Sequence, residues 1–238
     1  VTITPSGSVS SLVPQLSESK GKKDLANNPQ SLSVIYLGGM MELQNLIGGE
    51  MMNSESGNWL ENVEPATGKI FSRIPRSGAA DVEAAVQAAR KAFPGWSSTP
   101  FEERAACLRR LGALIATHSE ALIAAESQDN GKPVSLARAV DIPRAQKNLE
   151  FFAGAIEHFA SEVHIPGGSE FIHYTHRKPI GVVGCISPWN LPLYLFTWKI
   201  APALAAGNCV VAKPSEVTPV TAWMLSEWIA EAGFPSGA

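Results

Sequence analysis

The stretch Gly181-Val-Val-Gly-Cys-Ile-Ser-Pro-Trp-Asn190 decides the fold class of this sequence. Residues 180–186 form a nearly continuous apolar run, which is the pattern of a strand buried on both faces, as strands of parallel sheets are. Residues 187–190 then interrupt this run with a serine, a proline and an asparagine. The pattern predicts a buried strand that ends in a polar loop.

The segments after this loop repeat the pattern. Residues 193–206 are apolar nearly all round and predict a buried helix, which Pro202 is expected to disturb or to end early. Residues 209–212 form a second short apolar strand, and Thr218-Pro219 begins a further helix. The order strand, helix, strand, helix predicts an α/β fold with a Rossmann-like, doubly wound parallel sheet. Since only two of its strands can be recognised, this sheet is expected to be incomplete.

The sequence before the sheet contains a tail, helices and a hairpin. Residues 1–40 are rich in Ser, Pro, Gly, Asn and Lys without any periodicity, which predicts a disordered tail or an upstream segment foreign to the native protein. Turn chemistry at residues 62–68 predicts two paired strands. Of the helices that follow, one is expected to begin at Ser119 and to stop at Asn130-Gly131. Residues 162–179 have the pattern of a β-hairpin.

Composition excludes several classes of protein. The 238 residues are 45% hydrophobic and 17% charged, which is typical of an ordinary globular protein. The net charge is −3 and the 19 basic residues do not cluster, so no nucleic acid is expected as a partner. No stretch is apolar over the length that a bilayer span requires, so no membrane partner is expected. Three cysteines without CxxC spacing predict neither disulfides nor a zinc site and favour a reducing, cytoplasmic location.

The candidate ligand site lies where the two predicted strands end. In doubly wound sheets, ligands bind beyond the carboxyl ends of the strands, which directs attention to residues 187–190 and 213–216. Gly181 and Gly184 fall inside the strand and not in the turn after it, so they do not form a GxGxxG dinucleotide motif. The pattern alone therefore indicates a polar site and leaves its ligand open.

Four separated motifs resemble the aldehyde dehydrogenase family in order and spacing. They are Pro188-Trp-Asn190, Trp198-Lys-Ile-Ala-Pro-Ala203, Ala206-Gly-Asn208 and Lys213-Pro-Ser-Glu216. The similarity extends from about residue 43 to residue 238, so residues 41–238 are expected to form part of that family's coenzyme-binding domain.

Within the family, residues 141–144, 173–175 and 187–195 are most similar to the 2-aminomuconate semialdehyde dehydrogenase branch. The resemblance implies oxidation of an aldehyde, with 2-aminomuconic semialdehyde as a candidate, to a carboxylic acid with NAD. In the family this reaction proceeds through a thioester on a cysteine. The resemblance also implies that the hairpin at residues 162–179 contributes to subunit association and that the complete protein is a homo-oligomer.

The resemblance gives Asn190 the catalytic role of donating its amide to the aldehyde oxygen. An asparagine suits this role because it is neutral and offers fixed N–H donors where negative charge develops. Losing one such donor typically costs roughly 3 kcal/mol of barrier. The alternative is that Asn190 caps the following helix.

The resemblance also implies a coenzyme site. Lys213 and Glu216, with Ser215 between them, take the positions that hold the adenosine ribose. A carboxylate accepts a hydrogen bond from a free 2′-hydroxyl but repels a 2′-phosphate, so NAD is expected rather than NADP. An exposed ion pair without a ligand is the alternative for Lys213 and Glu216. The coenzyme path is expected to be lined by Ile186, Ser187, Pro188 and Trp189, although Trp189 could instead belong to the core.

The three cysteines are not expected to act as the nucleophile. Cys185 lies in an apolar strand where a thiolate is disfavoured, and Cys107 and Cys209 have the pattern of packing residues. The resemblance places the family's nucleophilic cysteine and general-base glutamate beyond Ala238, in a catalytic domain absent from this chain. We therefore expect the chain alone to be inactive. The alternative function is a non-catalytic chain that binds coenzyme or associates with full-length subunits.

The histidines of the predicted hairpin suggest a metal site. His173 and His176, however, are three residues apart on a predicted strand and so point to opposite faces. No bound metal is therefore expected.

Overall fold

The computed structural model describes residues 40–168 and 170–238. The chain divides at Gly39 into two units, and the second, Met40–Ala238, is the one described. The predicted tail therefore lies outside the described residues except for Met40, and the boundary at residue 40 stays a prediction. The elements in chain order are β1 (Met41–Glu42), β2 (Asn45–Ile47), β3 (Glu50–Met52), β4 (Trp59–Glu64), β5 (Lys69–Pro75), α1 (Ala79–Ser98), α2 (Phe101–Thr117), α3 (Ser119–Asn130), α4 (Val134–Leu136), the π-helix η1 (Ala137–Asp141), α5 (Ile142–Glu157), β6 (Val163–His164), β7 (His173–Tyr174), β8 (Val182–Ile186), α6 (Pro192–Ala205), β9 (Cys209–Lys213) and α7 (Val220–Glu227).

The first sheet confirms the strand pair that the turn at residues 62–68 predicts. β4 pairs antiparallel with β5, and β1 adds to the other edge of β5 in parallel. Gly68 has a φ of 69°, a left-handed conformation that glycine adopts without strain and that closes the turn. The face of this sheet buries Asn62 and Ser72, whose side chains are joined by a hydrogen bond of 3.0 Å.

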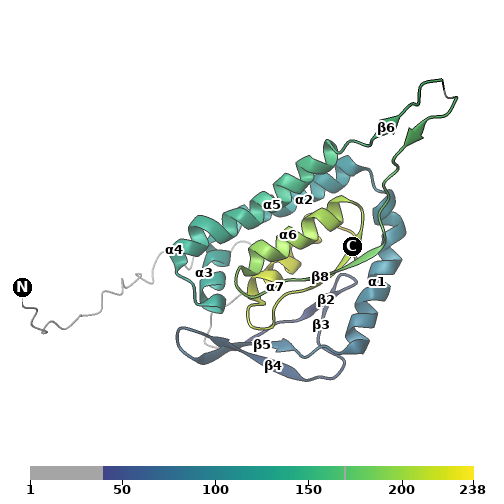
Figure 1. Cartoon of the computed structure of the whole chain (residues 1–238). Helices are drawn as coiled ribbons and strands as arrows, with labels where there is room; N and C mark the ends of the chain where they lie inside the picture. The colour runs from purple at the N-terminus through teal and green to yellow at the C-terminus, as the bar shows by residue number, and fades with distance from the viewer. Residues whose placement is uncertain (1–39, 169) are drawn as a thin grey trace, which may run out of the picture. The chain divides into compact units, whose positions relative to one another are not determined.

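The helices α2, α5 and α6 lie side by side, and α6 packs on the strands β8 and β9. α5 packs between α2 and α6, as Figure 1 shows. Leu108, Leu111 and Ile115 of α2 are fully buried in this layer, because their spacing of three and four residues places them on one face. Pro202 does not end α6, which continues to Ala205, because a proline this close to the end removes only one of the last hydrogen bonds.

The parallel sheet formed by β8 and β9 confirms the predicted parallel α/β arrangement. β8 pairs in parallel with β9, and α6 connects the two strands and packs on both. α1 also contacts both strands. The fold is therefore α/β, with α6 and α1 packed on a parallel pair of strands.

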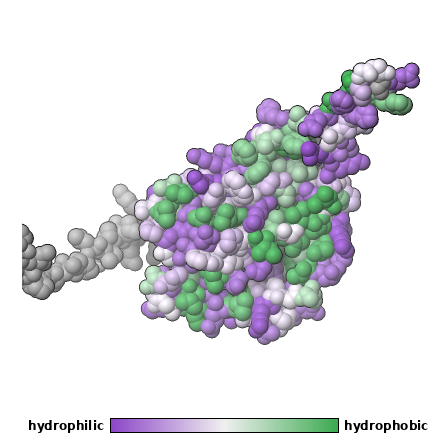
Figure 2. Space-filling view, in the orientation of Figure 1, coloured by the Kyte–Doolittle hydropathy of each residue, from purple (hydrophilic) through white to green (hydrophobic). Residues whose placement is uncertain are grey.

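The prediction that β8 is buried on both faces is wrong. Cys185 is buried, but Ile186 is 70% exposed and Gly184 is exposed as well. Alternate side chains of a strand point to opposite faces, and α6 covers the face of Cys185, whose thiol lies 3.6 Å from the Lys199 carbonyl oxygen. Figure 2 shows the apolar surface that remains over β8. The apolar run thus encodes a strand on which Gly184 and Ile186 remain exposed among the described residues.

The predicted hairpin is confirmed by the antiparallel pairing of β6 with β7, in which Val163 lies opposite Tyr174. It extends away from the helices as a narrow arm (Figure 1). Phe171 and Ile172 of this arm are 74% and 64% exposed. In the described part of the chain, no helix has the length and apolar character needed to span a membrane.

Candidate functional site at the ends of the parallel strands

The parallel register brings the two predicted binding segments together. Ile186 lies opposite Lys213, and the amide of Ser187 donates a 3.1 Å hydrogen bond to the Lys213 carbonyl oxygen. The chain turns away from the sheet after both residues. Segments 187–191 and 214–219 therefore leave the same edge of the sheet, where ligands of doubly wound folds bind.

Lys213 and Glu216 form an exposed ion pair at this edge. The Lys213 Nζ lies 2.9 Å from Glu216 Oε2, and the two side chains are 60% and 57% exposed. The hydrogen bond from Lys213 lowers the pKa of Glu216, so its carboxylate is ionised at neutral pH. Ser215 lies between them, and its hydroxyl oxygen accepts a long hydrogen bond from the Val217 amide. Both charged groups can be reached by a ligand, because neither is buried.

The four residues expected along the coenzyme path differ in exposure. Ile186 and Trp189 are 70% and 60% exposed, and Pro188 is exposed as well. The alternative that Trp189 belongs to the core is therefore wrong. Ser187 is buried, and its Oγ is among the buried atoms without a hydrogen-bond partner in the described structure.

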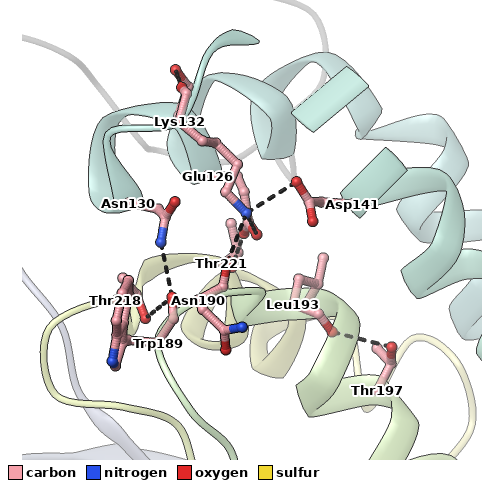
Figure 3. A network of polar contacts seen from close by, with 11 residues as sticks. Glu126, Asn130, Lys132, Asp141, Trp189, Asn190, Leu193, Thr197, Thr218 and Thr221 are labelled. Carbon is pink, nitrogen blue, oxygen red and sulfur yellow. Dashed lines mark hydrogen bonds and ion pairs between the residues drawn. The ribbon is translucent and has the colours of Figure 1, made fainter. Parts of the chain in front are cut away.

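Asn190 is exposed and does not cap the next helix. α6 begins at Pro192, and its N-cap is Leu191, without a side-chain capping bond. The alternative role of Asn190 as a helix cap is therefore wrong. Its backbone carbonyl oxygen accepts a hydrogen bond of 3.4 Å from the Lys132 Nζ. Figure 3 shows the loop of Trp189 and Asn190 lying against the end of α3.

The end of α3 holds the preceding carbonyl as well. Asn130 donates its side-chain amide to the Trp189 carbonyl oxygen at 2.8 Å, and the Thr218 hydroxyl lies 3.4 Å from the same oxygen (Figure 3). Gly131 ends α3 with a φ of 79°, as its place after Asn130 predicts. This left-handed turn reverses the chain between Asn130 and Lys132, and both side chains reach the same loop.

A buried ionic network lies next to this loop. The Lys132 Nζ lies 3.3 Å from Glu126 Oε1 and 3.0 Å from Asp141 Oδ2, and the three side chains are 6%, 0% and 0% exposed (Figure 3). The Thr221 hydroxyl donates to Glu126 Oε2 at 2.8 Å. Burial is the largest influence on Glu126 and raises its pKa, while the charge of Lys132 opposes that rise.

Another buried carboxylate, Asp129, joins three elements. It accepts hydrogen bonds from the Asn62 side chain at 2.6 Å and from the Val220 amide at 2.8 Å. Burial raises its pKa to about 7, with these two hydrogen bonds opposing the rise. The sequence carries a signal for this cluster in the spacing of α3. Leu122, Glu126 and Asp129 are spaced by four and three residues, which places two carboxylates on the buried face of α3.

The three cysteines have the character of packing residues. All are buried and unpaired. Burial raises the pKa of Cys107 and Cys185 and raises that of Cys209 to about 11. A thiolate is the reactive form of cysteine, so none of the three is suited to act as a nucleophile at neutral pH.

The hairpin histidines form no recognisable metal site. His164 lies across the hairpin from His173, with ring centroids 6.4 Å apart. Within residues 40–168 and 170–238, no group of three or more His, Cys, Asp or Glu side chains is arranged to hold a metal ion.

Residues 51–238 match the aldehyde dehydrogenase family. The chain belongs to that family. The bovine (Bos taurus) 2-aminomuconic semialdehyde dehydrogenase is 51% identical over 200 residues, which are 84% of this chain and 41% of the relative. This similarity confirms the branch that residues 141–144, 173–175 and 187–195 indicate. The chain thus spans less than half the length of this relative.

Two solved structures have folds similar to that of the chain. PnpE in complex with nicotinamide adenine dinucleotide is 40% identical, with a TM-score of 0.78 over 84% of this chain and 40% of that one. An NADP-dependent enzyme from E. coli is 34% identical, with a TM-score of 0.79 over 83% of this chain and 41% of that one. The fold of this chain is therefore similar both to a structure solved with NAD bound and to that of an NADP-dependent enzyme.

Proposed function

We propose that the complete protein containing these residues oxidises an aldehyde to a carboxylic acid with NAD, and that Asn190 donates a hydrogen bond to the aldehyde oxygen. The observation that carries this proposal is the exposed Asn190 on a loop that buried side chains hold by its backbone. An amide held in this way can stabilise the charge that develops on oxygen when a thiolate adds to the carbonyl carbon.

The exposed residues at the strand ends fit the coenzyme. Glu216 offers an ionised carboxylate and Lys213 a cation at the edge where ribose is bound in this family, with Ser215 beside them. Ile186 and Trp189 present exposed apolar surface, while Ser187 and Pro188 contribute backbone along the same path. NAD, when bound, accepts the hydride that leaves the aldehyde carbon. We propose NAD over NADP, because the Glu216 carboxylate would repel a 2′-phosphate.

The proposed substrate class is a semialdehyde. The name of the bovine relative supports 2-aminomuconic semialdehyde as the candidate. The test is the rate of NADH formation by the complete protein with this semialdehyde, betaine aldehyde and short aliphatic aldehydes. A preference for the aliphatic aldehydes would reject the semialdehyde, and no NADH with any aldehyde would reject the activity.

Two variants of the complete protein test the assigned roles. Asn190→Ala is expected to lower kcat about 100-fold, because an oxyanion donor is lost. Glu216→Ala is expected to raise the KM for NAD, with kcat unchanged at saturating NAD. The matched control is Glu120→Ala, which removes an exposed carboxylate paired with Arg138 away from the loop. If Asn190→Ala behaves like this control, the oxyanion role is wrong.

The buried cysteines favour a second candidate for the chain on its own, namely that residues 1–238 are non-catalytic. No described cysteine is suited to nucleophilic attack at neutral pH, so the purified chain should produce no NADH with any aldehyde. Steady NADH formation by residues 1–238 would contradict this proposal.

We also propose that the arm at residues 162–179 contributes to a homo-oligomer of the complete protein, and that the protein is cytoplasmic. The exposed apolar side chains Ile165 and Ile172 support association through the arm. Analytical ultracentrifugation of the complete protein with and without Ile165→Ser and Ile172→Ser tests the first proposal, and cell fractionation tests the second. Unchanged sedimentation in the double variant would exclude the arm.

A further inference from the structure

Asn190 is held through the two peptide groups on either side of it. The carbonyl of Trp189 accepts from the Asn130 amide at 2.8 Å, and the carbonyl of Asn190 itself receives the Lys132 ammonium at 3.4 Å. Each peptide group is planar, so fixing its carbonyl oxygen restrains the whole plane. The two planes meet at the Asn190 Cα. Restraining both therefore sets the direction in which the Asn190 side chain leaves the backbone.

Lys132 is itself confined by charge and burial. Its ammonium lies within 3.3 Å of carboxylate oxygens from both Glu126 and Asp141, and its side chain is 6% exposed. Glu126 comes from α3, and Asp141 ends η1, a single-turn π-helix of a kind that frequently occurs at functional sites. A buried ammonium cannot exchange these partners for water, so its third contact, the Asn190 carbonyl oxygen, has a fixed place.

We infer that Lys132, held by Glu126 and Asp141, is a positioning residue that aims the Asn190 amide. This inference rests on the proposed role of Asn190 as a hydrogen-bond donor. Lys132 is too deeply buried to touch a substrate at the loop surface, and it acts through the backbone of Asn190. A network that only stabilised helix packing would contact the helices alone. In this network Lys132 also contacts the loop residue Asn190, which lies 58 positions further along the chain.

The first test is structural and needs no activity. Crystal structures of the complete protein should show the Asn190 side chain displaced by about 1 Å or in several conformers in Lys132→Met, a shift large enough to impair catalysis. The control Arg138→Met removes a cation from an exposed pair with Glu120 and should leave Asn190 in place. An unmoved, equally ordered Asn190 in Lys132→Met would overturn the inference.

A second variant covers the case in which Lys132→Met does not fold. Glu126→Gln and Asp141→Asn, combined with Lys132→Met, remove both carboxylate charges that would otherwise be buried without a cation. The triple variant should fold and still show a displaced Asn190, because methionine cannot donate to its carbonyl oxygen. An undisplaced Asn190 in a folded triple variant would also overturn the inference.

The second test is a double-mutant cycle on kcat in the complete protein. We expect Lys132→Met to lower kcat about tenfold with little change in KM, and Asn190→Ala to lower it about 100-fold. The kcat of the combined variant should be no lower than that of Asn190→Ala. Once the Asn190 amide is removed, losing the residue that orients it has no further effect. If the two effects multiply to about 1000-fold, Lys132 acts independently of Asn190 and the inference is wrong.

The two tests separate failure of the inference from failure of the proposed function. If Asn190→Ala leaves kcat unchanged while Lys132→Met displaces Asn190, the oxyanion role fails and the positioning of the loop stands. If Asn190→Ala lowers kcat while Lys132→Met leaves Asn190 in place, the proposed function stands and the inference fails.

Discussion

Two lysines of this chain have carboxylate partners at almost the same distance and differ in nearly everything else. Lys132 lies 3.0 Å from Asp141 and its side chain is 6% exposed, whereas Lys213 lies 2.9 Å from Glu216 and its side chain is 60% exposed. The first pair is buried next to the loop that carries Asn190. The second lies on the surface where the parallel strands end. The two ion pairs therefore have similar lengths but differ in their exposure to solvent.

The pKa values of buried and exposed carboxylates near these two lysines are shifted in opposite directions. Burial raises the pKa of Glu126 and of Asp129, while the hydrogen bond from Lys213 lowers the pKa of exposed Glu216. A buried pair can fix a loop because water does not compete for its partners. An exposed pair contributes little to stability and can rearrange around a ligand. The buried group is thus suited to positioning and the exposed group to binding.

The largest expected difference in the free energy of unfolding is between the variants Lys132→Met and Lys213→Met. The first leaves two buried carboxylates without a cation and should lower the free energy of unfolding by about 3 to 5 kcal/mol. The second removes a surface pair and should change it by less than about 1 kcal/mol. Urea denaturation of both variants measures the two effects. Similar midpoints would show that burial does not distinguish the two pairs.

The next effect concerns pH and Asp129. Its pKa is about 7 in the folded chain, above the value of 3.8 that it has when exposed, so the folded state binds its proton more tightly. Tighter proton binding in the folded state adds to the free energy of unfolding. This contribution is fully present below pH 3.8 and is lost as the pH rises through about 7. The excess stability of the wild type over Asp129→Asn should therefore fall by about 2 to 3 kcal/mol between pH 5 and pH 8. Denaturation at both pH values measures it, and a constant difference would contradict the raised pKa.

A smaller effect is expected from the hydrogen bond that Thr221 donates to Glu126. Thr221→Val keeps the shape of the side chain but leaves the buried Oε2 of Glu126 without its donor, which should cost about 1 to 3 kcal/mol. Thr117→Val is the control, because the Thr117 hydroxyl bonds to a helix carbonyl at an exposed position. The shift in denaturation midpoint should be clear in the first variant and negligible in the second.

The smallest effect on stability is expected for Glu216→Ala. The exposed carboxylate contributes little to folding, so the denaturation midpoint should barely move. In the complete protein the same variant should raise the KM for NAD about tenfold, since one good hydrogen bond to ribose is lost. A change in stability without a change in KM would assign Glu216 to the structure and not to the coenzyme.

The exposed half of the candidate site could be predicted from local sequence. Alternating apolar and polar segments indicate β8, α6 and β9, and parallel strands place their carboxyl ends at one edge. The pairing of Ile186 with Lys213 follows from that topology. Gly131 could also be predicted to end α3, because glycine after asparagine is a common helix terminus. Each of these predictions depends on residues close together in the chain.

The buried half could not be predicted in the same way. Glu126 and Asp141 are separated by fifteen positions, and the loop residue that Lys132 contacts lies 58 positions further along. Whether such charges meet depends on how α3, η1 and the loop pack against one another. The exposure of Ile186 illustrates the same limit, because an apolar strand pattern does not tell which faces are covered.

The order of the elements, the family and the residues at the strand ends follow from local sequence, because strand and helix patterns and the four motifs are properties of contiguous residues. The packing of the folded chain buries Lys132 between Glu126 and Asp141 and brings it to the Asn190 carbonyl, whereas it leaves Lys213 exposed. Burial and long-range contacts arise when distant segments pack together, so local sequence does not distinguish the two lysines.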